Sequence, residues 1–103
     1  MSALQESGLS TLAPGRCRLA GDLGFATAPL LWRQAAVLQS AQVEGVVELD
    51  LSGVTHSDSA GLALLVAWQS RARAAGVTLR YIGLPDRLVA IAKISRVDSL
   101  FVG

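Results

Sequence analysis

The sequence predicts an α/β fold in which a mixed β-sheet carries its helices mainly on one face. Three observations support this prediction. A short apolar strand at 46–51 is followed by a polar loop and a helix. A second strand at 77–82 is also followed by a helix, and Pro14-Gly15 marks a turn near the N-terminus. Because strands joined through helices need parallel, right-handed crossovers, we expect a mixed sheet with the order β-β-α-β-α-β-α.

The N-terminal part is expected to supply two strands and one helix. Residues 16–20 alternate polar and apolar side chains, which is typical of a strand, and the segment before them can pair with them as a hairpin. Residues 21–24 are expected to form a loop. Thr27 can cap a helix that continues to about Gln39, and Pro29 is compatible with its first turn. Its buried face is predicted from the apolar residues at helical spacing, which are Leu31, Ala35 and Leu38.

The stretch from Val46 to Trp68 is the unit around which the other elements are arranged. Its strand is expected to end at Ser52-Gly53, and a polar loop follows at 55–59. The serines and the aspartate of this loop are residue types that satisfy free N–H groups at a helix start. The next nine residues, AGLALLVAW, are mostly good helix formers. Such strand–loop–helix junctions are where α/β proteins usually place their working surface.

The C-terminal elements repeat this pattern. Ala75-Gly76 is expected to end the central helix, and residues 77–82 alternate as a strand. A third helix is expected to start at 84–86, where Asp86 complements the positive helix end. Its predicted buried face consists of Leu88, Ile91, Ala92 and Ser95. A last apolar trio is expected to form either a short element or a clasp over the core: Val97, Leu100 and Phe101.

Length and composition favour one domain, spanning residues 1–103, in the cytoplasm. The chain is 51% hydrophobic with a mean hydropathy of +0.46. Its longest apolar run, Ala60 to Trp68, is nevertheless far shorter than the roughly 20 residues that span a bilayer. No signal peptide is expected, because the first basic residue is Arg16 and no apolar segment precedes it. We therefore expect no direct membrane insertion.

Several kinds of site lack support in the sequence. A net charge of +1 gives no electrostatic argument for nucleic acid. Cys17 is the only cysteine, so no internal disulfide can form, and we interpret it as a small buried hydrophobe on a strand. One histidine and one cysteine make no metal site. We expect no cofactor.

His56 lies beside Ser57, Asp58 and Ser59, a set that invites comparison with a hydrolase triad. A triad requires three side chains that converge in space, whereas four consecutive residues fan outward. The sequence also has no second histidine and no G-x-S-x-G motif. We therefore predict no catalytic residues and no enzymatic activity.

Two short motifs are similar to a known family pattern. They are DLSGV at 50–54 and DSAGL at 58–62. With them the chain resembles the STAS domain, the fold of anti-sigma factor antagonists and of sulfate-transporter cytoplasmic tails. In that family a strand ending in D-L-S-x-V precedes a helix opened by D-S/T-S/G-G-L. The similarity in element order extends from about Arg16 to Phe101, and it implies a STAS-like mixed sheet.

Within this family the chain is most similar to the small, MlaB-like STAS subunit of the Mla-type phospholipid ABC transporter of Gram-negative bacteria. The similar segments are SAGLALL at 59–65 and LPDRLVAIAK at 84–93. The resemblance implies a non-catalytic accessory subunit that binds the transporter's ATPase and stabilises or regulates it. The complex would contain a membrane permease and maintain outer-membrane lipid asymmetry, and this subunit would be cytoplasmic and peripheral to the inner membrane.

The alternative function implied by the family is an anti-sigma factor antagonist of a partner-switching system. In antagonists regulated by phosphorylation, the acceptor is the second serine of a D-S-S-G motif. Ala60 occupies that position and has no hydroxyl, so the standard phosphoswitch is absent. Ser59 is an alternative candidate phosphoacceptor, which the resemblance alone does not establish.

The partner-binding surface is expected on the polar loop and the outward face of the central helix. Helical phase places the core face at Leu64, Leu65, Trp68, Ala72 and Ala75. Small residues on the opposite arc either form a flat surface for another helix or merely raise helicity. Asp58 and Ser59 likewise either contact a partner or act only as caps. The predicted partner-binding residues are Thr55, His56, Asp58, Ser59, Ala60, Ala63, Ala67, Ser70 and Arg71.

Overall fold

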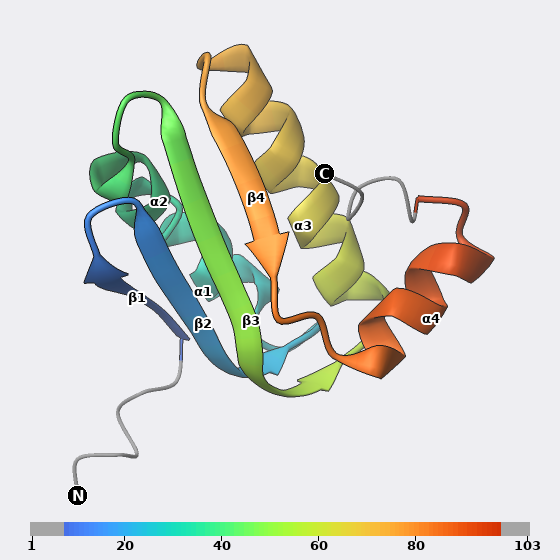
Figure 1. Ribbon diagram of the computed structural model, residues 1–103. Helices are drawn as coiled ribbons and strands as arrows, with labels where there is room; N and C mark the ends of the chain where they lie inside the picture. The colour runs from blue at the N-terminus through green and yellow to red at the C-terminus, as the bar shows by residue number, and fades with distance from the viewer. Residues whose placement is uncertain (1–7, 98–103) are drawn as a thin grey trace, which may run out of the picture.

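The computed structural model describes residues 8–97, which form four strands and four helices (Figure 1). In chain order they are β1 (Gly8–Ala13), β2 (Arg16–Leu23), α1 (Ala28–Arg33), α2 (Ala36–Ala41), β3 (Val46–Ser57), α3 (Ser59–Ala74), β4 (Thr78–Ile82) and α4 (Asp86–Ile94). Leu100 and Phe101, predicted to belong to a final apolar trio, lie outside the described residues.

The strands form a mixed sheet, as predicted, and lie in it in the order β1-β2-β3-β4. β1 and β2 are antiparallel and make the expected hairpin, in which Gly15 takes the positive φ of +81° that its turn requires. β2 pairs with β3, and β3 with β4, in parallel. This register aligns Cys17 with Leu49 and Leu49 with Tyr81, so the middle of the sheet presents one continuous buried row.

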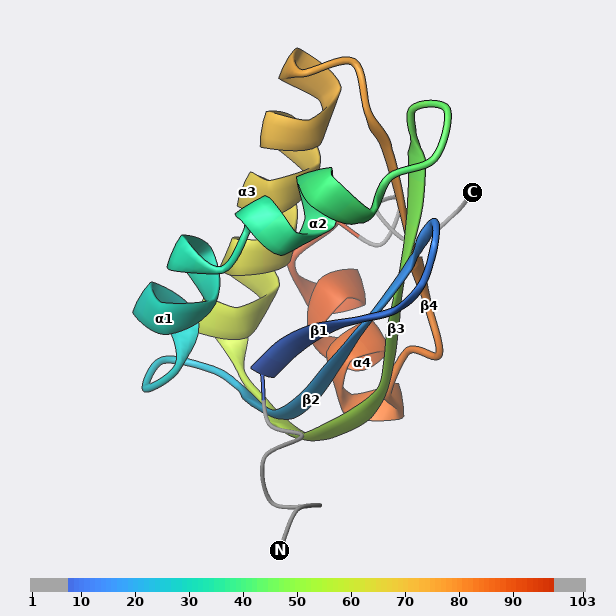
Figure 2. The ribbon, with the colours of Figure 1, turned by 90° about the vertical axis from the view of Figure 1, so that its left-hand side faces the viewer.

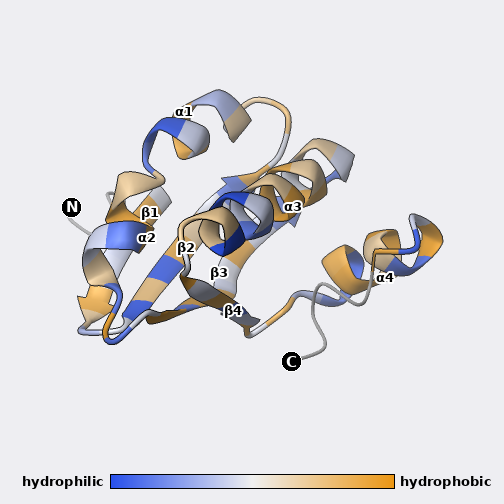
Figure 3. Cartoon of the chain, turned by 90° about the horizontal axis from the view of Figure 1, so that it is seen from above, coloured by the Kyte–Doolittle hydropathy of each residue, from blue (hydrophilic) through white to orange (hydrophobic). Residues whose placement is uncertain are grey.

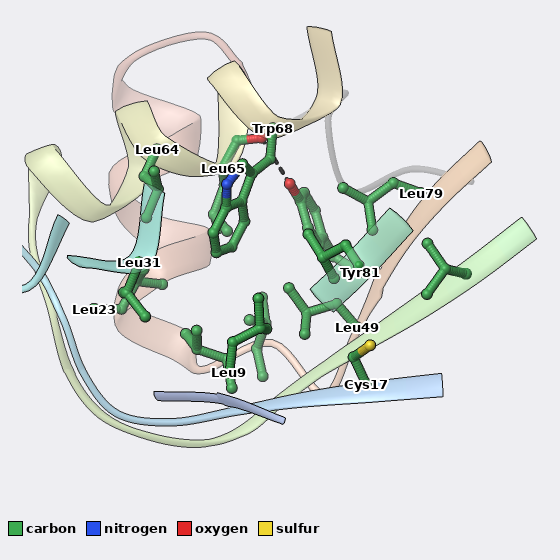
Figure 4. Close-up of a cluster of buried hydrophobic side chains, with 14 of the residues drawn as sticks. Leu9, Cys17, Leu23, Leu31, Leu49, Leu64, Leu65, Trp68, Leu79 and Tyr81 are labelled. Carbon is green, nitrogen blue, oxygen red and sulfur yellow. Dashed lines mark hydrogen bonds between the residues drawn. The ribbon is translucent and has the colours of Figure 1, made fainter. Parts of the chain in front are cut away.

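The first three helices cover one face of the sheet, and α4 lies beyond its β4 edge (Figures 2 and 3). The core lies between these helices and the sheet. Figure 4 shows Trp68 of α3 among the leucines of the strands, and the Tyr81 hydroxyl donates a hydrogen bond to the Leu65 carbonyl over 2.7 Å. Cys17 is fully buried, and this burial raises the pKa of its thiol, as suits a small core hydrophobe.

Two strands are longer than predicted. β2 continues through residues 21–23, where a loop was expected, and β3 continues past Ser52-Gly53 to Ser57. The two extensions pair with each other, so each satisfies the other's backbone groups. The register shifts between the pairs Arg18–Asp50 and Ala20–Gly53, so Leu51 and Ser52 together lie opposite Leu19 and form a bulge. Ser52-Gly53 therefore does not end β3.

The helix predicted from Thr27 to Gln39 is interrupted at Gln34-Ala35 and forms two short helices, α1 and α2. The halves pack on different elements, because α1 contacts α3 whereas α2 contacts the strands. The Gln34 side chain is also used at the break, where its Oε1 accepts a hydrogen bond from the Leu9 N–H of β1 at 3.2 Å. Helical periodicity alone does not show such a change of direction.

Two predicted core positions are exposed. Ala75 is the C-cap residue of α3, and Ser95 is the C-cap residue of α4. Helical phase was correct for Leu64, Leu65 and Trp68, which are all buried. At the last turn the chain leaves the helix, so the periodic extrapolation no longer applies.

Candidate functional site

Asp58 fixes the junction between β3 and α3 with both of its carboxylate oxygens. Oδ1 accepts hydrogen bonds from the backbone N–H groups of Ala60 at 2.9 Å and Gly61 at 3.1 Å, so Asp58 is the N-cap of α3. Oδ2 accepts a hydrogen bond from the Phe25 N–H at 3.1 Å. These bonds, that from Phe25 first, lower the pKa of Asp58 below its ordinary value of 3.8. One side chain therefore ties the helix start to the loop between β2 and α1.

That loop has further anchors. The Thr27 hydroxyl donates to the Asp22 carbonyl at 2.8 Å and accepts from the Gly24 N–H at 3.1 Å. Thr27 holds the predicted N-cap position of α1, but its side chain bonds backward to the loop and makes no cap hydrogen bond. These hydrogen bonds hold the loop backbone in place. The Phe25 side chain of the same loop points to solvent, with 81% of its surface exposed.

The ends of β2 and β3 are joined at the same edge by an exposed pair. His56 Nδ1 lies 2.7 Å from Asp22 Oδ1. Ser57 next to it is buried, with 2% exposed, and its carbonyl accepts a hydrogen bond from Arg87 Nε of α4 at 2.9 Å. His56 therefore contacts β2, whereas the adjacent Ser57 contacts α4.

α3 starts in direct contact with the end of β2. A Cβ atom added at Gly61 would overlap the carbonyl oxygen of Leu23, so no larger residue fits here without a shift of the helix. The glycine of the DSAGL motif is thereby explained by packing. The helix is pressed onto the sheet on one side, and its opposite side remains open to solvent.

The predicted partner-binding residues all lie at the surface. Those on the exposed side are Thr55, His56, Ser59, Ala63, Ser70 and Arg71, and those half-buried are Asp58, Ala60 and Ala67. The first turns of α3 bring Asp58, Ser59 and Ala63 together. Arg71 lies at the far end of the helix, where its guanidinium is 5.0 Å from the centre of the Trp32 ring.

Sequence reasoning missed the apolar residues beside this polar tip. Phe25 follows β2, Leu30 lies in α1 with 52% of its surface exposed, and Val66 of α3 has 38% exposed. The only sequence signal was that Phe25 belongs to no apolar period, because it stands in a loop between Gly24 and Ala26. The candidate site therefore combines a capped polar helix start with exposed apolar side chains, which is typical of protein-binding surfaces.

Within residues 8–97, no group of three or more histidine, cysteine, aspartate or glutamate side chains could hold a metal ion. None of the helices in this range is both long and apolar enough to cross a membrane.

Comparisons with known proteins identify a family and a fold. Residues 8–102 match the family model described as "Mlab, STAS domain". No curated protein matched the sequence. Among solved structures, the anti-sigma factor antagonist SpoIIAA in its unphosphorylated form is similar at 14% identity and a TM-score of 0.60, over 84% of this chain and 80% of that chain. A sulfate transporter family protein from Wolinella succinogenes is similar at 21% identity and a TM-score of 0.61, over 86% and 74%. At these identities the likeness concerns the fold, and it confirms the predicted STAS-like architecture.

Proposed function

This chain belongs to the Mlab, STAS domain family, and we propose that it is a non-catalytic accessory subunit of an Mla-type ABC transporter. It binds the transporter's ATPase and stabilises or regulates it. The observation that carries the proposal is the family match, which includes every described helix and strand. The complex, with its membrane permease, moves phospholipid and maintains outer-membrane lipid asymmetry. The subunit lies in the cytoplasm and reaches the inner membrane only through its partners.

We place the contact with the ATPase on the docking face, defined as Phe25, Asp58, Ser59, Ala63 and Val66. These residues lie at the start of α3 and on the loop that Asp58 holds against it. Serine and alanine on the outward side allow a partner helix to approach closely. Phe25 offers a large apolar side chain at low entropic cost, because its backbone N–H is already fixed.

The predicted residues farther along α3 extend this face. Ala67, Ser70 and Arg71 follow Ala63 on the same side of the helix or beside it. Thr55 and His56 flank it on β3. We keep them in the proposed interface as its rim, where individual side chains contribute less to the binding free energy.

The alternative, an anti-sigma factor antagonist, has the likeness to SpoIIAA in its favour, but at 14% identity this likeness extends only to the fold. Ala60 provides no acceptor hydroxyl at the second motif serine. The transporter subunit is therefore the better supported proposal.

The test is co-purification of the tagged chain from its native host, with identification of the proteins that co-elute. The key variant is Ser59→Glu. The new carboxylate lies near the positive end of α3, where the fold should tolerate it, but at a packed interface it would be desolvated without a partner. We expect a folded variant that no longer retains the ATPase.

Ser40→Glu, at an exposed position of α2, is the matched control and should retain the partner. Retention of the ATPase by Ser59→Glu at wild-type level would remove the start of α3 from the interface. Co-elution of an anti-sigma factor in place of an ATPase would favour the alternative function.

A further inference from the structure

We propose that a cavity between α1, α2 and the C-terminal half of α3 binds a small amphipathic carboxylate, an anion with an apolar chain or ring. The cavity has a volume of about 360 Å³, within the range of roughly 300–1,000 Å³ in which small-molecule sites fall. It lies at the opposite end of α3 from Asp58 and shares only Arg71 with the rim of the proposed interface, and the proposal does not rest on the transporter role. No partner protein is needed for its test.

The inner wall of the cavity is apolar and belongs to the core. Trp68 has only 2% of its surface exposed, and Leu38 and Val47 beside it are also buried. Trp32, with 39% exposed, lines the same cavity nearer to solvent. An occupant therefore meets two indole rings and aliphatic side chains, which suit a short hydrocarbon chain or an aromatic ring.

The charged groups of the lining are both cationic. They are Arg33 and Arg71, and no acidic residue of the described part of the chain lines the cavity. Within residues 8–97 neither guanidinium forms an ion pair with a carboxylate, and that of Arg71 lies over the Trp32 ring. Arginine binds carboxylates with two parallel hydrogen bonds, so the polar end of the ligand is best matched by a carboxylate. A cationic head would be repelled.

A second observation concerns the indole N–H of Trp68. It is buried and has no hydrogen-bond partner among the described residues. Buried donors are rarely left without an acceptor. This nitrogen has almost no accessible surface, so it lies behind the cavity wall, and the preference for a carboxylate rests on the two arginines.

The experiment uses the chain's own fluorescence, since its only two tryptophans both line the cavity. The probe is 11-bromoundecanoate, whose bromine quenches nearby indoles, titrated below its micelle-forming concentration. We expect saturable quenching that decanoate reverses by competition and that decyltrimethylammonium, with the same chain length and a positive head, does not reverse. Quenching without saturation, or equal competition by the cationic compound, would overturn the proposal.

Variants locate the binding. Ala36→Phe fills the cavity from an exposed position and should abolish the saturable quenching, whereas Ala90→Phe, on α4, should leave it unchanged. Joint replacement of Arg33 and Arg71 by glutamine should weaken binding about tenfold, and Arg73→Gln should not. Saturable quenching that survives Ala36→Phe would place the probe elsewhere and contradict the assignment.

Discussion

The two faces of α3 are similar in hydropathy but differ in their surroundings. The inward face holds Leu65 and Trp68, with at most 2% of their surfaces exposed, and Gly61, which touches the β2 backbone. The outward face holds Ala63 and Val66, which are exposed. Apolar residues therefore serve two purposes on one helix. Those facing inward determine the free energy of folding, and we expect those facing outward to determine association.

The largest expected effect on stability is at Leu65. Leu65→Ala removes a fully buried side chain and leaves a cavity, so it should lower the free energy of unfolding by roughly 2–5 kcal/mol. The neighbouring control, Val66→Ala, should change it by no more than about 0.5 kcal/mol, because Val66 is partly in solvent. Urea unfolding measures both. Equal losses for the pair would show that the helix is rotated from the orientation described.

A smaller but clear loss is expected for Gly61→Ala. The added methyl group overlaps the Leu23 carbonyl and pushes α3 away from β2, at a net cost of roughly 1–3 kcal/mol after the gain in helix propensity. Thermal unfolding shows whether Gly61→Ala lowers or raises the melting temperature. Ala63→Gly, on the outward face, is the comparison variant. An increase in melting temperature for Gly61→Ala would contradict the close approach of helix and strand.

Asp58→Asn should have a smaller, pH-dependent effect. The pKa of Asp58 is lowered by its hydrogen bonds, so its carboxylate contributes stability above its unfolded-state pKa, and this contribution is lost as pH falls through the folded pKa. The difference in unfolding midpoint between wild type and variant should therefore be present at neutral pH and shrink toward pH 2. A difference that stays constant over this range would show that the negative charge of Asp58 does not contribute to folding stability.

The smallest effect on stability is expected for Phe25→Ala. With 81% of its surface in solvent, this side chain contributes little to folding, and its backbone N–H can still bond to Asp58. We expect an unchanged melting temperature together with reduced recovery of the ATPase in co-purification. Leu12→Ala, which removes another exposed apolar side chain from β1, is the control. Equal recovery with both variants would exclude Phe25 from the interface.

Most of the architecture could be predicted from the sequence because its signals are local. The hairpin turn, the capped start of α3 and the alternation in β4 each depend on neighbouring residues. The extensions of β2 and β3 could not be predicted, because residues 21–23 and 52–57 become strands only through pairing with each other. The break at Gln34-Ala35 also depends on distant packing, since α1 follows α3 and α2 follows the sheet.

Only the part of the candidate site that depends on neighbouring residues could be predicted. Asp58 and Ser59 are recognisable from their position before a helix, and Asp58 indeed caps it. The hydrogen bond from Phe25 to Asp58 joins residues 33 positions apart, and no spacing rule predicts it. Whether the predicted surface residues bind a partner stays a prediction until the association experiments are made.

The parallel pairing of β2 with β3 also governs how the chain folds. The β1–β2 hairpin closes over a tight turn and can form within about 1–10 μs. Pairing of β3 with β2 is slower, because it requires closure of the loop that contains α1 and α2. Until then the unpaired edge of β2 is open to other unfolded chains, which exposes this strand to aggregation. Cys17 lies on that strand, and its buried Sγ faces α2, 4.0 Å from the Val37 carbonyl oxygen. Its rate of reaction with a thiol reagent would therefore report when α2 packs on the sheet.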